Sequence, residues 1–445
     1  MSPGWMIPGS VRVLCAGFRQ FFKFAYSKSS RTIIKRMDSI PKKQNRIQEF
    51  FHTERGRHVA LWLTYFLFWG GTAAFMAYIS LYYESVNLSG RQIGQLTSIP
   101  LFVSLISSMI FGFISDASRR NRLLLSVASI GLIAVLLVFP RVQTFWLLFP
   151  MVLLYSVFHA PNNPILDQTT LNTLEHPEDY GKMRMGGSIG WGLVVLLTGF
   201  LIDNLGLGIP VIFYINIAFM LVFLVIISVT PSSHKKTHED SEPPTLKNLG
   251  KMVAQPGVFL LFLVIIIWGM GEASIGNFLF LHIKHLGGSS TLMGTALSVS
   301  LIGEIVTFTV ASRIQKRIGE FRMILVAFAV LIIWLGGLSM IKDPNLIPVF
   351  QIFGGAGFAL IQSGSVAYIN RKAPRELGTT AQALRGGLFA GLGSGVGALI
   401  SGALYEFYGS SSMFRIMAVL EICGLVFGLF VYLREQSKRA ALPEG

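Results

Sequence analysis

The sequence contains few charged side chains, and long apolar runs separate the ones it has. Asp, Glu, Lys and Arg make up 13% of the 445 residues, whereas 52% are hydrophobic and the mean hydropathy is +0.60. A water-soluble domain covers its surface with charged residues, which make up about a quarter of its composition. This composition excludes an ordinary soluble domain and indicates a protein embedded in a lipid bilayer.

Motifs of several enzyme classes are missing as well. The two cysteines, Cys15 and Cys423, provide neither a disulfide framework nor metal-ligand spacing. The chain has no GxxxxGKS/T phosphate loop, no HExxH, no GxSxG and no CxxC, so it lacks the motifs of ATP-driven pumps, metalloproteases, serine hydrolases and redox proteins. We therefore expect no enzymatic activity, no cofactor and no bound metal.

Twelve apolar runs follow one another between residues 59 and 433. Each is close to the roughly 20 residues that a helix needs to cross a bilayer. The sequence therefore predicts an all-α membrane protein of twelve transmembrane helices. The predicted spans are 59–83, 92–115, 122–140, 144–171, 183–203, 210–230, 257–282, 290–312, 321–341, 346–369, 380–405 and 412–433.

Lys and Arg residues lie mainly between these runs, on alternating sides. If the N-terminus is cytoplasmic, the inside segments hold 31 of the 37 Lys and Arg, including 12 in residues 1–58. By the positive-inside rule, this bias predicts that both termini are cytoplasmic. The net charge of +15 is thus a topology signal, and we expect no nucleic-acid partner.

The two groups of six spans are related by an internal repeat. Residues 68–94 align with 267–294, and 199–206 (GFLIDNLG) align with 402–409 (GALYEFYG). We expect two parallel six-helix halves, 59–230 and 257–433, around a site at the membrane midplane, as in alternating-access carriers. Residues 1–58 form a basic cytoplasmic extension, 231–256 a central cytoplasmic loop and 434–445 a cytoplasmic tail.

The loop after the second span, 112–122 (GFISDASRRNR), resembles the cytoplasmic signature of the major facilitator superfamily. Ala117 and Arg119 depart from that pattern, at a basic position and a glycine position. The resemblance implies that Asp116, Arg119 and Arg122 close the cytoplasmic side. Three further stretches, 179–190, 301–304 and 381–384, resemble the branch that holds lactose permease, nucleoside:proton symporters and phenylpropionic-acid permease. That resemblance implies proton-coupled uptake of a small organic solute.

Three acids lie deep within predicted spans, where an ionised carboxylate costs about 2.5–3.5 kcal/mol on insertion scales. Glu421, in the twelfth span, is interpreted as structural, because the family resemblance implies that this helix is peripheral. Glu304 lies in the eighth span and Glu272 is midway along the seventh, among glycines. Such an acid faces a cavity, pairs with a cation or takes up a proton. Both are candidates for proton coupling, and Glu272 is also a candidate for substrate contact. Structural hydrogen bonding inside the bundle is the alternative for each.

A basic residue, Arg385, lies near the cytoplasmic start of the eleventh span. The family resemblance implies that the eighth and eleventh helices are neighbours. We therefore expect that Glu304 and Arg385 can pair, and that protonation of Glu304 frees Arg385 for the cargo. The alternative is that Arg385 extends to the lipid headgroups.

The fourth span has three polar residues on one helix face, beside two prolines that should bend the helix. These residues are His159, Asn163 and Asp167, with Pro161 and Pro164. His159 and Asn163 are candidates for substrate binding, because such a stripe on a cavity-lining helix predicts a binding surface. Asp167 could instead pair with Lys182 or Arg184 in the cytoplasmic gate. A lone histidine in a core is usually only hydrogen-bonded.

Trp62, Tyr65 and Trp69 share one face of the first span. On a cavity wall, Tyr65 and Trp69 would stack against a ring-shaped cargo, although such a stripe is more often helix packing. Gln362, in the tenth span, is a further candidate for substrate contact.

The expected function is proton symport of a sugar, nucleoside or aromatic acid by alternating access. The alternatives are uniport or antiport without proton coupling, or a receptor or scaffold of carrier fold. The expected partners are the solute, protons and the lipid bilayer, and we expect a monomer. A cell membrane is favoured, but the basic, acid-free leader through Arg36 resembles a transit peptide, so a plastid or mitochondrial envelope is the alternative.

Overall fold

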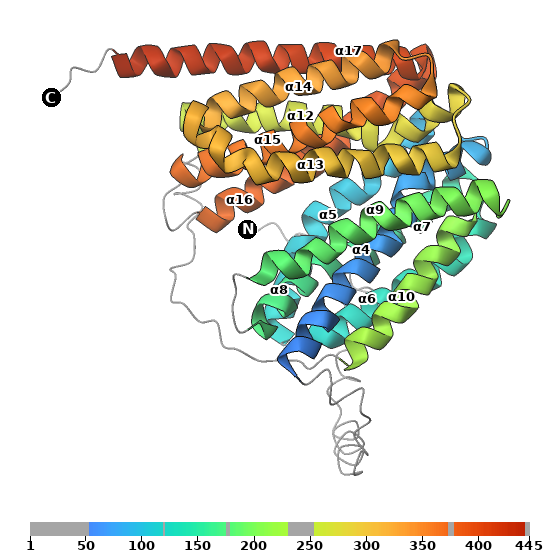
Figure 1. The fold of residues 1–445 in the computed structure, drawn as a ribbon. Helices are drawn as coiled ribbons and strands as arrows, with labels where there is room; N and C mark the ends of the chain where they lie inside the picture. The colour runs from blue at the N-terminus through green and yellow to red at the C-terminus, as the bar shows by residue number, and fades with distance from the viewer. Residues whose placement is uncertain (1–52, 119–120, 175–178, 230–252, 373–377, 441–445) are drawn as a thin grey trace, which may run out of the picture. The chain divides into compact units, whose positions relative to one another are not determined.

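The computed structural model describes residues 53–118, 121–174, 179–229, 253–372 and 378–440, and every element in these ranges is a helix. The helices between Glu54 and Ala440 belong to one compact unit (Figure 1). Ten of the described helices are long and apolar enough to cross a membrane. The expected all-α membrane fold is therefore confirmed.

The first six spans are formed by seven helices, because the fourth span is broken in two. The helices are α4 (Glu54–Ser85), α5 (Gly90–Ser118), α6 (Asn121–Val138), α7 (Phe145–His159), α8 (Asn162–Thr173), α9 (Tyr180–Asn204) and α10 (Val211–Val229). The break between α7 and α8 contains Pro161, whose ring and missing N–H interrupt a helix. The interruption lies where the prolines predict a bend, and both residues between the two helices keep helical φ and ψ angles.

The last six spans are formed by the helices that follow along the chain. They comprise α12 (Pro256–His285), α13 (Ser290–Ile318), α14 (Glu320–Met340), α15 (Ile347–Lys372), α16 (Gly378–Gly387), the π-helical turn η5 (Leu388–Gly393) and α17 (Ser394–Ala440). The chain reverses within α17 at Gly409, whose φ of 75° lies in the region that glycine tolerates. The segments before and after Gly409 therefore form the eleventh and twelfth spans.

The two halves meet along two pairs of helices. Within the halves, α4 packs on α9 and α10, and α12 packs on α17. Between the halves, α9 lies beside α13 (Figure 1), and α5 contacts α17. We call the end of the bundle that holds the α4–α5, α9–α10 and α12–α13 connections the far end. The opposite end, where α4 and α12 begin, is the leader end.

Glycines bring α9 close to α4. A Cβ atom on Gly186 would lie 2.5 Å from the carbonyl oxygen of Trp62, and one on Gly190 would lie 2.4 Å from that of Phe66. Small residues four apart let membrane helices approach backbone to backbone. In the second half, a Cβ atom on Gly393 would lie 2.7 Å from the carbonyl oxygen of Ile266 on α12.

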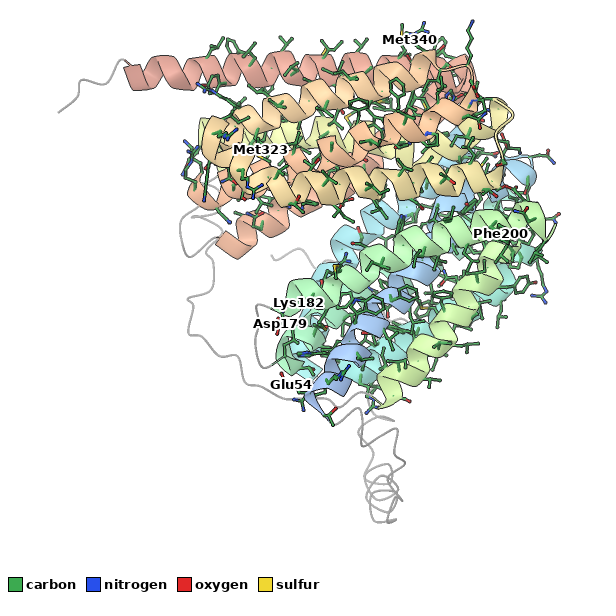
Figure 2. All side chains as sticks on the ribbon, in the orientation of Figure 1. Glu54, Asp179, Lys182, Phe200, Met323 and Met340 are labelled. Atoms are coloured by element: carbon green, nitrogen blue, oxygen red, sulfur yellow. The ribbon has the colours of Figure 1, made fainter. Side chains whose placement is uncertain are left out.

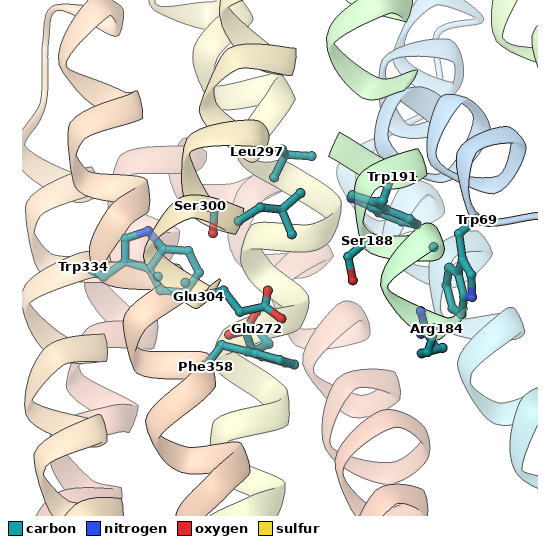
Figure 3. Close-up of a pocket in the computed structure, with 14 residues that line it drawn as sticks. Trp69, Arg184, Ser188, Trp191, Glu272, Leu297, Ser300, Glu304, Trp334 and Phe358 are labelled. Carbon is teal, nitrogen blue, oxygen red and sulfur yellow. The ribbon is translucent and has the colours of Figure 1, made fainter. Parts of the chain in front are cut away.

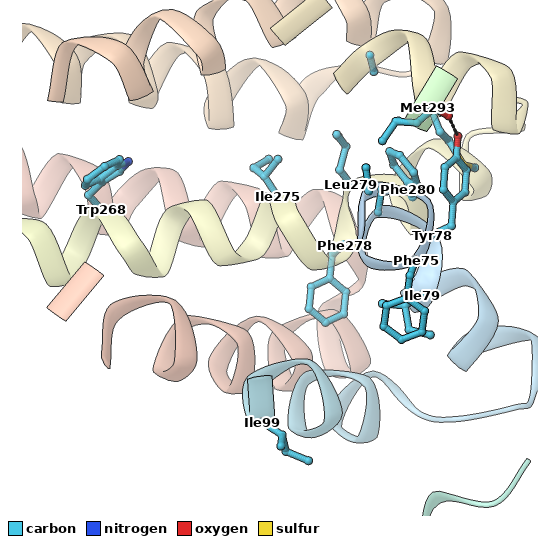
Figure 4. Close-up of a cluster of buried hydrophobic side chains, with 14 of the residues drawn as sticks. Phe75, Tyr78, Ile79, Ile99, Trp268, Ile275, Phe278, Leu279, Phe280 and Met293 are labelled. Atoms are coloured by element: carbon cyan, nitrogen blue, oxygen red, sulfur yellow. Dashed lines mark hydrogen bonds between the residues drawn. The ribbon is translucent and has the colours of Figure 1, made fainter. Parts of the chain in front are cut away.

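Aromatic side chains fill the core where α4 nears the far end. Phe75 stacks on Tyr155 with ring centroids 4.3 Å apart, and Tyr78 contacts Phe280 of α12 at 4.6 Å (Figure 4). On the outside of the bundle, large apolar side chains such as Phe200 and Met340 are exposed (Figure 2). In a helical membrane protein, such an apolar exterior faces the lipid.

We expect Gly190→Ala to lower the melting temperature of the detergent-solubilised protein. The added methyl group would overlap the Phe66 carbonyl oxygen, and overpacking of this kind costs about 1–3 kcal/mol. The matched control is Gly336→Ala on α14, because no atom lies within 4 Å of the position its Cβ would take. An equal effect of both substitutions would contradict the close packing of α4 on α9.

Candidate functional site

A pocket of about 370 Å³ lies between the two halves. Its walls come from α4 and α9 on one side and from α12, α13, α14 and α15 on the other (Figure 3). The lining residues are Trp69, Arg184, Gly187, Ser188, Trp191, Glu272, Leu297, Ser300, Leu301, Glu304, Trp334, Gly354, Gly355 and Phe358. The volume is within the usual range for sites that bind small molecules.

The second-half wall carries the two acids singled out from the sequence. Glu272, on α12, accepts a hydrogen bond from the indole N–H of Trp268 at 3.4 Å. Glu304, on α13, lies within electrostatic range of Glu272 and of Arg184 across the pocket. Neither acid forms an ion pair with any residue in the described ranges. Two carboxyl groups thus face the same cavity without a cation in contact.

The first-half wall carries one cation set against aromatic rings. The guanidinium of Arg184 lies 4.8 Å from the ring centre of Trp69 and 5.6 Å from that of Tyr65. Trp69 in turn contacts Trp191, with ring centroids 6.0 Å apart. The buried indole N–H of Trp69 has no hydrogen-bond partner in the structure. This wall therefore offers a positive charge and two indole faces.

Arg184, which the sequence predicts for the cytoplasmic gate, lies on the pocket wall in this structure. The reason is its position on α9, where Arg184, Ser188 and Trp191 are spaced by four and three residues and so share one helix face. Ser188 and Trp191 were not singled out from the sequence, although this spacing could have identified them. Trp334, on α14, had no such signal because it is one of many apolar residues in its span.

The polar stripe of the fourth span contacts α4 and is not part of the pocket lining. The Tyr65 hydroxyl donates to Asp167 at 2.6 Å, and the Asn163 side-chain amide donates to the other Asp167 oxygen at 3.5 Å. His159 shares a hydrogen bond of 3.2 Å with Thr72. These contacts tie α4 to α7 and α8, which leaves Trp69 as the first-span aromatic in the pocket.

Arg385 is buried among hydrogen-bond acceptors. Its guanidinium donates to Gln382 at 3.0 Å, to Gln362 at 2.9 Å and to Ser365 at 3.3 Å. In this structure no ion pair joins Arg385 to Glu304, and both residues are within the described ranges. Gln362 is thus engaged by Arg385 and does not line the pocket.

The proposed cytoplasmic gate is only partly described. Arg119 and the side chain of Asp116 lie outside the described residues, and Arg122 is exposed at the start of α6. The described residues contain no group of three His, Cys, Asp or Glu that could hold a metal ion. The site chemistry of the described chain is therefore that of the two acids, Arg184 and the aromatic walls.

Comparison with known proteins agrees with this architecture. The model of the MFS_1 like family matches residues 58–416. The maltose permease of Geobacillus stearothermophilus is 26% identical over 380 residues, which cover 84% of this chain and 94% of the permease. The probable 3-phenylpropionic acid transporter of Escherichia coli is 23% identical over 365 residues, covering 81% of this chain and 94% of that protein.

Solved structures share the fold. The nucleoside transporter NupG superposes with a TM-score of 0.75 at 15% identity, covering 84% of this chain and 99% of NupG. A bacterial homologue of the human lysosomal transporter Spinster, in an inward-facing and unoccupied conformation, gives a TM-score of 0.65 at 13% identity, with 84% and 96% covered. At these identities the likeness concerns the fold alone.

We expect Gln362→Ala to destabilise the protein, because it removes an acceptor from a buried guanidinium. An unsatisfied buried polar group costs about 1–3 kcal/mol, and more when it is charged. Gln362→Glu, which restores an acceptor of the same length, should melt at or above the wild-type temperature. If both variants melt like the wild type, Gln362 does not hold Arg385.

Proposed function

Because the chain belongs to the MFS_1 like family and is a membrane transporter of the major facilitator type, we propose that it couples the uptake of a small organic solute to proton entry. The observation that carries the proposal is the pair of acids without an ion-pair partner, Glu272 and Glu304, in the pocket between the halves. An intramembrane acid on a cavity is a proton or substrate site by default.

The mechanism uses the charges on the two pocket walls. When Glu304 is ionised, it attracts Arg184 across the pocket, since the two are within electrostatic range. A proton on Glu304 removes that attraction and leaves Arg184 available to the solute. Glu272, beside Glu304, would share or relay the proton because two adjacent carboxylates disfavour joint ionisation. Binding of proton and solute would then change the preferred arrangement of the two halves.

The pocket favours a ring-bearing solute with polar substituents. Trp69, Trp191 and Phe358 supply flat apolar surfaces, and Ser188 and Ser300 supply hydroxyl groups. Sugars, nucleosides and aromatic acids all combine a flat or ring-shaped face with polar groups. The names of the relatives, a maltose permease and a probable 3-phenylpropionic acid transporter, agree with that range.

The charge distribution supports a cytoplasmic leader end, with both termini inside the cell. The hydrogen bonds that join the halves within the described ranges lie at the far end or midway along the helices. With that topology the closed side is the external one, so the structure would correspond to an inward-facing state. We propose a monomer in a cell membrane, with an organelle envelope as the alternative.

Uptake into proteoliposomes tests the coupling. We expect an inward proton gradient to drive accumulation of one solute from a panel of maltose, nucleosides and 3-phenylpropionate. Glu304→Gln and Glu272→Gln should abolish gradient-driven accumulation, because an amide cannot exchange a proton, while solute exchange between the two sides persists. Glu320→Gln, which alters a second-half acid outside the pocket that is paired with Arg371, is the matched control.

Three outcomes would count against this proposal. Gradient-independent equilibration of the solute would indicate uniport, and export driven by the gradient would indicate antiport. The absence of flux for every solute, in a protein that still binds one of them, would indicate a receptor.

A further inference from the structure

Two acids at the far end occupy matching positions in the internal repeat. Asp203 is near the end of α9, four residues after Gly199. Glu406 is on α17, four residues after Gly402. Because the segments 199–206 and 402–409 align with each other, the two acids are equivalent residues of the two halves. Neither acid lines the pocket.

Asp203, in the first half, caps a helix of the second half. Its carboxylate accepts the backbone N–H of Ser290 at 3.1 Å and that of Thr291 at 2.6 Å, and also the Thr291 hydroxyl at 2.8 Å. Since α13 begins at Ser290, these N–H groups lie in its first turn and have no partner within the helix. The positive end of the α13 dipole also favours a negative charge there.

Glu406, in the second half, caps a helix of the first half in the same way. Its carboxylate accepts the backbone N–H of Arg91 at 2.8 Å and lies 3.9 Å from the Arg91 guanidinium. α5 begins at Gly90, so this N–H is again in the first turn of a helix. The Arg91 guanidinium also lies 4.2 Å from the ring centre of Phe407.

Glycines let each cap form at contact distance. A Cβ on Gly199 would lie 2.2 Å from the carbonyl oxygen of Ser290, and one on Gly402 would lie 2.6 Å from that of Gly90. Two more glycines at equivalent repeat positions complete the contacts, Gly294 against Val195 and Gly94 against Ala398. Each contact therefore consists of an acid and a glycine from one half against the first turn of a helix in the other half. The roles of the two halves are exchanged between the two contacts.

We propose that Asp203 and Glu406 form a pair of crossed caps that holds the far end closed during the transport cycle. Each half satisfies the first-turn N–H groups of a helix in the other half. When the far end opens, both carboxylates separate from these groups and water must replace them. The inference rests on the transporter's two halves moving apart, and it does not depend on proton coupling.

The crossed caps do not act alone. At the same end, Glu84 of α4 pairs with Lys284 and lies 3.4 Å from His285 of α12, and the Tyr405 hydroxyl donates to it at 3.4 Å. Loss of the caps should therefore shift the balance between closed and open far ends without abolishing the closed state.

Distances between two spin labels at the far end test the crossed caps. The labels are attached to Leu207→Cys in the first half and to Met340→Cys in the second half, because both positions are exposed. The native Cys15 and Cys423 are replaced by serine in this protein. We expect Asp203→Ala with Glu406→Ala to raise the ratio of the longer to the shorter distance by about threefold to thirtyfold, because two charges at helix ends are lost. Asp203→Asn with Glu406→Gln, which keeps the acceptors, should give an intermediate ratio.

The matched control is Asp343→Asn. Asp343 also accepts a first-turn N–H at the far end, that of Asn345 at 3.0 Å, but within its own half. Its substitution should leave the distances unchanged. Unchanged distances in the double alanine variant, or an equal shift in the control, would overturn the inference. Each single alanine variant repeats the test if the double variant does not fold. Because the measurement needs neither solute nor proton gradient, its failure would be distinct from a failure of proton coupling.

Discussion

Hydrocarbon offers no hydrogen-bond partners, so every polar group inside the membrane must find one in the protein or in a water-filled cavity. Several intramembrane polar groups among the described residues find protein partners. Asp167 is held by Tyr65, and Arg385 is held by Gln362 and two further acceptors. Glu272 and Glu304 differ, because they face the pocket without a cation in contact. The transport chemistry proposed for this protein depends on that difference.

The same constraint explains why the fold could be predicted from the sequence. A span must be a helix and must match the thickness of the bilayer, so apolar runs and the charges between them give the number and order of helices. The break at Pro161 was predictable because proline acts locally. The π-helical turn Leu388–Gly393 was not predictable from the sequence. α12 packs against this turn, and Trp268 of α12 stacks on Phe389 at 4.0 Å, so the turn lies at a contact between segments far apart in the chain.

The site was less predictable, because the face that a helix turns toward the other half depends on packing. The depth of an acid in its span is visible in the sequence, and this identified Glu272 and Glu304. Arg184, predicted for the cytoplasmic gate, lies over the ring of Trp69 on α4, a contact between two helices that the sequence alone does not reveal. Trp334 could not be separated from other apolar residues by pattern alone. The repeat aligned Asp203 with Glu406, but only the structure has them capping opposite helices.

The central claim is that the two acids face a water-filled pocket between the halves, and thiol labelling tests it most directly. In a protein without Cys15 and Cys423, Ser300→Cys places a thiol on the pocket wall, whereas Ile302→Cys places one on the exposed apolar side of the same helix. We predict that a charged, membrane-impermeant thiol reagent modifies Ser300→Cys from one side of a proteoliposome and leaves Ile302→Cys unmodified. The account would be contradicted if Ser300→Cys stayed unmodified from both sides, or if Ile302→Cys reacted equally.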